Sequence, residues 1–287
     1  MKFVIENEPR YGIGNKLHVL IGEFRLASEY YNMDFVILWE NDMQHFSFSE
    51  LFDDSEFTII NRSQLNDEYF VPSTCQDLKR NKHIQIVKKG DIVRAFEFGF
   101  PMLNNEDELI KDIFTYKNKK NTLAYMYDRT PKTIKESYLK YFNMLKPCKN
   151  IQIVLDNFVS EKFSGNILGV HIRLGDKITK NKLKISEIQK YYPFVDHEIS
   201  QNKYDKIFVS CDEQIGYDLM TQRYENKVIR YDHDYDKDQK DDKVALICIL
   251  LLSKCDKLMC VVGSTFSEMA WWFGGCKDIL VINHQVF

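Results

Sequence analysis

The residues best suited to chemistry follow an apolar segment in the second half of the chain. The segment runs Gly169-Val-His-Ile-Arg-Leu-Gly-Asp-Lys177. The strand predicted at its start would present four polar side chains at its carboxyl end, namely those of His171, Arg173, Asp176 and Lys177. In open α/β sheets, ligands bind at the carboxyl ends of the strands. Arg173 and Lys177 suit an anion such as a diphosphate, because a guanidinium can make a two-pronged contact with it. The alternative is a surface ion pair between Arg173 and Asp176, with His171 half-buried and satisfied.

Two further motifs also follow predicted strands. Val262-Gly-Ser-Thr-Phe-Ser-Glu268 joins a strand to a helix, and backbone N–H groups at such a helix start favour phosphate, together with the hydroxyls of Ser264, Thr265 and Ser267. Plain N-capping by Ser264, with no ligand, would explain the same residues. The segment Phe208–Glu213 ends in carboxylates. Of these, Asp212 could accept hydrogen bonds from a base or a ribose, or simply start a helix.

Other patterns point away from metal ions. The segment Tyr231–Asp242 has alternating carboxylates, but a calcium loop starting at Asp232 would need glycine and glutamate where Lys237 and Lys243 stand. We expect a solvated loop there. The seven cysteines include no CxxC pair, so we expect buried reduced thiols and no zinc site.

Composition restricts the class of protein. The 287 residues are 44% hydrophobic and 28% charged, as in an ordinary globular protein. The net charge of −3 excludes a dedicated basic nucleic-acid platform, although a local basic cleft stays compatible with it. The first residues lack the apolar h-region of a signal peptide, and the longest apolar run, 244–252, is too short to span a membrane. We therefore expect a cytoplasmic protein, or one whose anchor has been removed.

Short apolar runs alternate with amphipathic stretches, which is typical of α/β proteins. A strand at 3–5, a turn at 12–15, a helix to about 31 and a strand at 35–39 form an opening βαβ unit. The second half predicts strands at 167–172, 206–210, 227–231, 257–262 and 279–282. Helices are predicted there at 193–202, 242–254 and 264–273.

The middle of the chain is less regular. It predicts strands at 58–60, 84–87 and 92–96, and helices at 105–114, 133–145 and 151–163. We place a junction within 146–165, which gives two domains, 1–150 and 151–287.

Together, the motifs resemble the GT-B fucosyltransferase superfamily, which includes the α1,2- and α1,6-fucosyltransferases and the protein O-fucosyltransferases. The matching residues are Gly12-Ile-Gly-Asn-Lys-Leu17 at the start of the first helix, His171–Lys177, Ser210–Glu213 and Ser264–Ser267 with Trp271-Trp272. Residues 45–165 are unmatched. The resemblance implies two Rossmann-like domains facing across a cleft, the first on the acceptor side and the second binding the donor.

The resemblance also implies a substrate and residue roles. GDP-fucose would be the donor, a glycan or another hydroxyl compound the acceptor, and no metal or other cofactor would be needed. Arg173 would bind the β-phosphate and stabilise the departing GDP, and His171 would position the nucleotide. The remaining donor-site residues would be Asp176, Lys177, Asp212, Ser264, Thr265, Phe266 and Ser267. Gly12, Gly14 and Asn15 would line the cleft from the N-terminal side.

The chain departs from the family pattern at two positions. Related families place an aspartate at the position of Cys248, and the α1,6 enzymes place a glutamate at the position of Asn181. Asp241 or Asp242 could substitute for the first. A general base is not assigned by the sequence; Asp176, Glu40 and Asp42 are candidates by position. The two tryptophans, Trp271 and Trp272, are more typical of a helix core than of a sugar platform.

We therefore predict an inverting fucosyltransferase that uses GDP-fucose. One alternative is a relative that binds nucleotide-sugar or glycan without turnover, which the departures at Cys248 and Asn181 allow. Another is an unrelated dinucleotide enzyme. The dinucleotide enzyme is disfavoured because the third glycine of G-x-G-x-x-G is missing after Gly14, and because no acidic residue obviously ends the second strand except Glu40.

Overall fold

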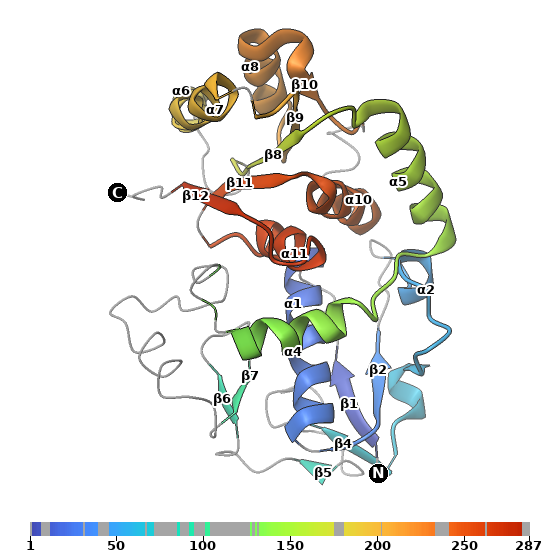
Figure 1. Ribbon diagram of the computed structural model, residues 1–287. Coiled ribbons are helices and arrows are strands. Elements are labelled where there is room, and N and C mark those ends of the chain that lie inside the picture. Colours follow the sequence, from blue (N-terminus) through green and yellow to red (C-terminus); the bar gives the residue numbers. More distant parts are fainter. Residues whose placement is uncertain are drawn as a thin grey trace. The chain divides into compact units, whose positions relative to one another are not determined.

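The protein forms two compact units, unit 1 (Met1–Lys149) and unit 2 (Asn150–Phe287), each with its own parallel β-sheet (Figure 1). The structure is a computed structural model, and it describes residues 2–6, 12–30, 32–39, 46–66, 68–71, 85–86, 92–94, 101–103, 127, 130, 132–174, 181–201, 203–232, 241–261 and 263–282. The helix predicted at 105–114 and most of the acidic loop, 233–240, lie outside these residues.

The sheet of unit 1 has the strand order β3-β2-β1-β4-β5, and all of its pairs are parallel. Its strands are β1 (Lys2–Glu6), β2 (Phe35–Leu38), β3 (Ile59–Ile60), β4 (Tyr69–Val71) and β5 (Gln85–Ile86). A separate antiparallel pair consists of β6 (Ile92–Arg94) and β7 (Pro101–Leu103). The central strand β1 is apolar and its residues Phe3, Val4 and Ile5 are fully buried, as expected for a parallel sheet covered on both faces.

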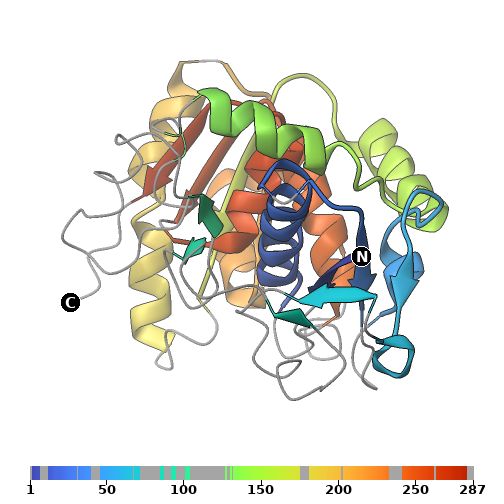
Figure 2. The same ribbon diagram turned by 90° about the horizontal axis from the view of Figure 1, so that it is seen from below.

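The main helices of unit 1 are α1 (Ile13–Arg25), which continues as the π-helical turn η1 (Leu26–Tyr30), and α4 (Lys132–Phe142). Two shorter ones are α2 (Phe48–Leu51) and the 3-10 turn η2 (Arg62–Gln64). In both views α4 lies beside α1 (Figures 1 and 2). Arg25 Nε donates to Ser137 Oγ at 2.9 Å, and Ser137 Oγ donates to the Glu29 carboxylate at 2.8 Å. These bonds connect the end of α1 and η1 to α4.

The sheet of unit 2 repeats the same pattern, with the parallel order β10-β9-β8-β11-β12. Its strands are β8 (Ile167–Ile172), β9 (Lys206–Cys211), β10 (Val228–Ile229), β11 (Lys257–Val261) and β12 (Ile279–Ile282). Its helices are α5 (Lys149–Lys162), α6 (Asn181–Gln189), α7 (Tyr192–Ser200), α8 (Gln214–Tyr224), α10 (Asp242–Lys254) and α11 (Thr265–Phe273), with a 3-10 turn η7 (Glu225–Lys227).

The two faces of β8 contact different helices, because successive side chains of a strand point in opposite directions. Leu168, Val170 and Ile172 are fully buried in a core with residues of α6, α7 and α8. His171 points to the other face, where α11 lies (Figure 1). This alternation directs one polar residue of an otherwise apolar strand toward the start of α11.

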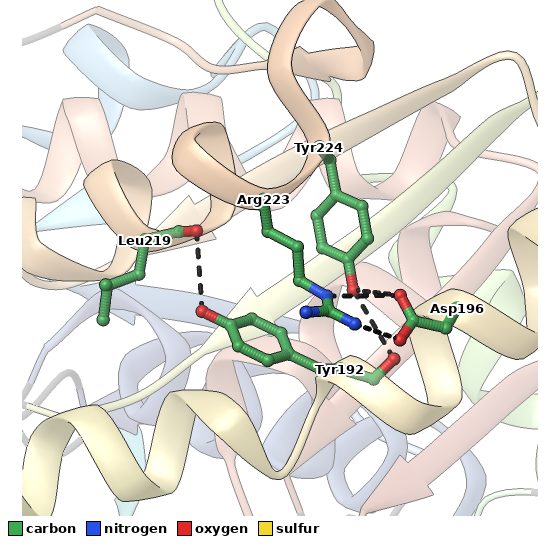
Figure 3. Close-up of polar contacts among 5 residues, drawn as sticks. All are labelled: Tyr192, Asp196, Leu219, Arg223 and Tyr224. Atoms are coloured by element: carbon green, nitrogen blue, oxygen red, sulfur yellow. Dashed lines mark hydrogen bonds and ion pairs between the residues drawn. The ribbon is translucent and has the colours of Figure 1, made fainter.

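A polar cluster joins α7 to α8 on the outside of unit 2 (Figure 3). Arg223 Nη2 donates to Asp196 Oδ2 at 2.5 Å, and Tyr224 Oη donates to Asp196 Oδ1 at 2.9 Å. The guanidinium lies over the rings of Tyr192 and Tyr224, 4.6 and 5.6 Å from their centroids. We call these four residues the α7–α8 cluster.

The predicted α/β class with parallel sheets is confirmed. The predicted helix at 242–254 and strand at 279–282 agree with α10 and β12 at both ends. The sequence did not predict β4, β7, α6 or α8. The six cysteines among the described residues are free thiols, and four of them are buried, namely Cys211, Cys248, Cys255 and Cys260. In the part of the chain that is described, no helix is long and apolar enough to cross a bilayer.

Candidate functional site

The strand order of unit 2 reverses between β8 and β11. The chain passes from β8 to β9 on one side and later returns to β11 on the other side of β8. Ligands of open parallel sheets bind where the strand order reverses in this way, outside the carboxyl ends of the strands. Arg173 directly follows β8, and Ser264 begins α11 after β11. The fold therefore brings the two main sequence motifs to the same edge of the sheet.

A direct contact joins these motifs. The Nδ1 atom of His171 lies 2.5 Å from the hydroxyl oxygen of Ser267, and both residues are buried. The imidazole also stacks on the ring of Phe266, with centroids 4.7 Å apart and planes 18° from parallel. His171 is thus held by two consecutive residues of α11 that lie 95 and 96 positions later in the chain.

A third residue holds His171 from the opposite face of the sheet. Tyr191 Oη donates to the backbone carbonyl of His171 at 3.1 Å. Burial raises the pKa of the Tyr191 phenol well above its ordinary value, so it stays neutral and able to donate. This contact could not be predicted from the sequence, because Tyr191 lies just outside the predicted helix at 193–202.

Asp212, which follows β9, bonds to the residue after Arg173. Its Oδ1 atom accepts a hydrogen bond from the backbone N–H of Leu174 at 2.8 Å. Arg173 is half-buried and stands between this bond and the end of β8. The bond fixes the path of the chain where it leaves the strand, a role the sequence did not suggest for Asp212. A contact of Asp212 with a base or ribose stays a prediction.

Ser264 occupies the N-cap position of α11 but does not cap it. Its backbone is extended (φ −94°, ψ 113°), and its side chain makes no capping hydrogen bond. The hydroxyl is buried, and no residue in the described ranges is its hydrogen-bond partner. The alternative of plain N-capping by the Ser264 side chain is thus contradicted. A buried polar atom without a partner is rare in proteins and calls for an explanation, such as an ion or ligand that binds there.

The geometry around Ser264 favours an anion. The preceding residue Gly263 has φ +73°, a conformation that side chains rarely adopt, so a glycine is required in this turn. The nine-residue helix α11 starts immediately afterwards, and the N–H groups of its first turn point out of the helix. These N–H groups and the helix dipole stabilise negative charge. Thr265 and Phe266 belong to this first turn.

The position of the missing family aspartate is fully buried. Cys248 is 4% exposed, its thiol hydrogen-bonds with Ser210, and burial raises its pKa to about 12. It is therefore a neutral thiol at physiological pH. Asp241 caps α10 instead, because its Oδ1 accepts from the N–H groups of Lys243 and Val244 at 2.7 and 3.0 Å. Asp242 is buried at 3% exposure.

The glycine motif of unit 1 begins α1. Gly12 is exposed, and its carbonyl accepts from the N–H groups of Asn15 and Lys16 at 3.0 and 3.2 Å. Gly14 lies in the first turn of α1. A Cβ atom at Gly12 would meet no atom within 4 Å, so a side chain would fit there in the described structure. Lys16 is buried, with its ammonium 5.8 Å from the centre of the Trp39 ring at the end of β2.

The tryptophans of α11 are core residues, as expected. Trp271 and Trp272 are 0% and 1% exposed. Their indole N–H groups donate to the carbonyl of Lys277 at 2.9 Å and to the carboxylate of Glu268 at 3.2 Å. Neither indole presents a face to a sugar.

Several predicted site residues lie outside the described part of the chain. These are Asp176, Lys177, Glu40 and Asp42, so three candidate bases and one phosphate-binding candidate stay predictions. Within the described residues, no group of three or more His, Cys, Asp or Glu side chains is arranged to hold a metal ion.

Comparison with solved structures identifies the fold. NodZ α1,6-fucosyltransferase soaked with GDP-fucose is 19% identical, with a TM-score of 0.59, over 99% of this chain and 95% of NodZ. Another NodZ structure, from Bradyrhizobium, is 20% identical, with a TM-score of 0.57, over 94% of this chain and 91% of that one. POFUT1 in complex with GDP-fucose is 12% identical, with a TM-score of 0.57, over 100% and 98%. No family model matches the chain, and no curated protein matches it in sequence.

The chain thus has the fold of these fucosyltransferases along nearly its whole length, and the predicted resemblance to their superfamily is confirmed at the level of the fold. Sequence identities of 10–20% establish no activity. A proposal of function must therefore come from the site itself.

Proposed function

We propose that this protein is a GDP-fucose-dependent, inverting fucosyltransferase that transfers fucose to a glycan or another hydroxyl acceptor without a metal ion. The donor would bind to unit 2, at the carboxyl edge between β8 and β11. Unit 1 would supply the acceptor side, as in a GT-B enzyme with two domains facing across a cleft. The cytoplasmic location expected from the sequence stays a prediction.

One observation carries the proposal. The hydroxyl of Ser264 is buried and unpartnered among the described residues, at the start of a helix and at the switch point of a parallel sheet. A diphosphate would supply the missing hydrogen-bond acceptor and would meet the N–H groups of the first turn of α11. Arg173 follows the neighbouring strand, so a cation would lie on the other side of the same anion.

The chemistry that this site can support is charge stabilisation. In the transfer, the bond between the anomeric carbon of fucose and the β-phosphate oxygen breaks, and GDP leaves with the electron pair. The acceptor oxygen forms the new bond from the opposite face and loses its proton to a base. Negative charge grows on the diphosphate as the bond breaks, so the fixed guanidinium of Arg173 and the dipole of α11 bind the transition state more tightly than the ground state.

A thermal-shift experiment tests the nucleotide. GDP and GDP-fucose should raise the melting temperature with EDTA present, whereas UDP and NAD should not. A ligand at 100 times its Kd adds about 2.7 kcal/mol to the free energy of unfolding, which is easily detected. Stabilisation by UDP alone would contradict the guanine assignment, and stabilisation by NAD alone would favour a dinucleotide enzyme.

A second measurement separates an enzyme from a binding protein. Release of GDP from GDP-fucose should be detectable over hours with wild-type protein and lost in Arg173→Ala. Binding of GDP-fucose without release of GDP, with a panel of sugar acceptors present, would support the non-catalytic alternative that the departures at Cys248 and Asn181 allow.

A further inference from the structure

We infer that Ser267 is a positioning residue that acts through His171 and does not itself bind the phosphate, so the serines of the Ser264–Ser267 motif have different tasks. This inference rests on the proposed function, because it concerns the site that would hold GDP. It departs from the role that the family resemblance implies, in which Ser264 and Ser267 both contact phosphate.

The two serines form a natural comparison. Each is 2% exposed and lies at the start of α11. The hydroxyl of Ser267 lies 2.5 Å from Nδ1 of His171, so it already has a hydrogen-bond partner on β8. The hydroxyl of Ser264 has no partner in the described part of the chain. Only Ser264 therefore gains its first hydrogen bond when an anion binds.

The contacts of His171 determine how its ring can meet a ligand. Stacking on Phe266 sets the plane of the imidazole, and the bond to Ser267 sets which nitrogen faces α11. The hydroxyl can donate to Nδ1 or accept from it, so the bond is available to either tautomer and its effect is on the orientation of the ring. Ser267 thus helps to hold His171 in the orientation in which it would meet the nucleotide.

A second buried polar residue lies beside His171 on the neighbouring strand. His171 pairs with Ser210 in the register of β8 and β9, so both side chains point to the same face of the sheet. Ser210 in turn contacts Cys248 of α10. His171 is therefore buried, and loss of its hydrogen bond to Ser267 would leave a polar group without compensation there.

A double-mutant cycle on GDP binding tests the inference. The Kd for GDP is measured by calorimetry for wild type, Ser267→Ala, His171→Ala and the double variant. Loss of one positioned hydrogen bond typically corresponds to about 3- to 10-fold in Kd, so Ser267→Ala should weaken binding by that factor. In the His171→Ala background, the same substitution should change Kd by less than about 2-fold, because its effect passes through the imidazole.

Three control variants separate an effect that passes through His171 from a direct contact with GDP and from a general effect of removing a hydroxyl. Ser264→Ala should weaken GDP binding about 10-fold in both backgrounds, because that hydroxyl contacts the ligand directly. Ser267→Thr, which keeps the hydroxyl, should restore most of the lost affinity. Ser160→Ala removes an exposed hydroxyl of α5 that donates to the carbonyl of Asn157, and it should leave GDP binding unchanged. An equal loss from Ser267→Ala in both backgrounds would overturn the inference alone, whereas failure of wild-type protein to bind GDP would overturn the proposed function and this inference with it.

A ligand-free measurement covers the case in which His171→Ala does not fold. Long-range ¹⁵N spectra of protein labelled at its seven histidines report the tautomer of each ring. Ser267→Ala should shift the two ring-nitrogen signals of one histidine, and Ser264→Ala should leave that histidine unchanged. Spectra that are identical in wild type and Ser267→Ala would overturn the inference, whatever the protein binds.

Discussion

The carboxylate of Asp212 accepts the backbone N–H of Leu174 at 2.8 Å, across 38 positions of the chain. This bond ties the end of β9 to the residue that follows Arg173. A strand end can leave a sheet in many directions, and the direction decides where the next side chain points. Asp212 therefore helps to set the position of the cation proposed to meet the diphosphate.

Substitutions at Asp212 can separate this positioning from direct ligand contact. Asparagine keeps an oxygen that accepts from Leu174, so Asp212→Asn should retain kcat/KM for GDP-fucose within about 3-fold. Asp212→Ala loses the acceptor and should cost about 10-fold or more, since small displacements of a catalytic group are expensive. Steady-state release of GDP measures both. Equal, large losses in the two variants would show that the negative charge itself is needed.

Arg173 is the residue on which transfer should depend most. Removing one preorganised charge-stabilising group typically lowers kcat by about 10²–10³, or about 2.7–4 kcal/mol. Arg173→Ala should show this loss and weaker GDP binding while remaining folded, because the residue is only half-buried at a strand end. Arg173→Lys should recover part of the rate, since an ammonium keeps the charge and loses the planar fork. Near wild-type transfer by folded Arg173→Ala would refute the donor-site assignment.

Ser264→Ala should separate stability from binding. The buried hydroxyl makes no hydrogen bond among the described residues, so its removal breaks none there and relieves the cost of burying a polar atom. We expect the free energy of unfolding to stay within about 0.5 kcal/mol of wild type or to rise by about 1 kcal/mol. Affinity for GDP should fall at the same time. Urea unfolding and calorimetry on one preparation test both, and a clear loss of stability would mean that Ser264 is an ordinary cap.

Elements bounded by strong local signals could be predicted from the sequence. Asp241 caps the start of helix α10, which ends at Lys254. The apolar run between these two charged residues fits a buried helix. Helix α6 could not be predicted, because its apolar residues do not follow a helical stripe. Leu183 is 53% exposed, whereas Ile188 is fully buried. The fold of α6 depends on the sheet it covers, which local patterns do not reveal.

The candidate site could likewise be predicted only where local sequence signals determine it. The sequence places Arg173, Asp212 and Ser264 at strand ends, because a strand end is a local property followed by polar residues. It cannot tell Ser264 from Ser267, because both are serines at one helix start. The difference comes from β8, whose alternation turns His171 toward Ser267 and leaves Ser264 without a partner among the described residues. Roles that depend on such long-range contacts need the tertiary structure.

The α7–α8 cluster leads to a prediction about pH (Figure 3). The hydrogen bond from Arg223 is the main cause that lowers the pKa of the Asp196 carboxyl below its ordinary 3.8. Burial, and then the bond to Asp196, raise the pKa of Tyr224 above its ordinary 10.0. A carboxyl whose pKa is lowered by folding adds stability at pH values above its unfolded pKa, and this stability is lost as the pH falls through its folded pKa. A phenol whose pKa is raised by folding adds stability at pH values below its unfolded pKa, and this stability is lost as the pH rises through its folded pKa. The cluster should thus stabilise unit 2 most between about pH 4 and 10.

Arg223→Ala should therefore lower the melting temperature at pH 7 and have a smaller effect at pH 3, because the stability that the lowered pKa of Asp196 adds is lost progressively as the pH falls below the unfolded value. The shift should be small, about 1–3 °C, because the two side chains of the ion pair are 44% and 43% exposed and solvent screens them. Arg223→Lys should show an intermediate shift, since it keeps the charge but stacks less well between Tyr192 and Tyr224. Lys132→Ala removes an ion pair whose partners are 88% and 64% exposed, and it should cause no shift at either pH. A shift from Arg223→Ala that is equally large at pH 3 would mean that the stacked guanidinium, and not its bond to Asp196, holds α7 against α8.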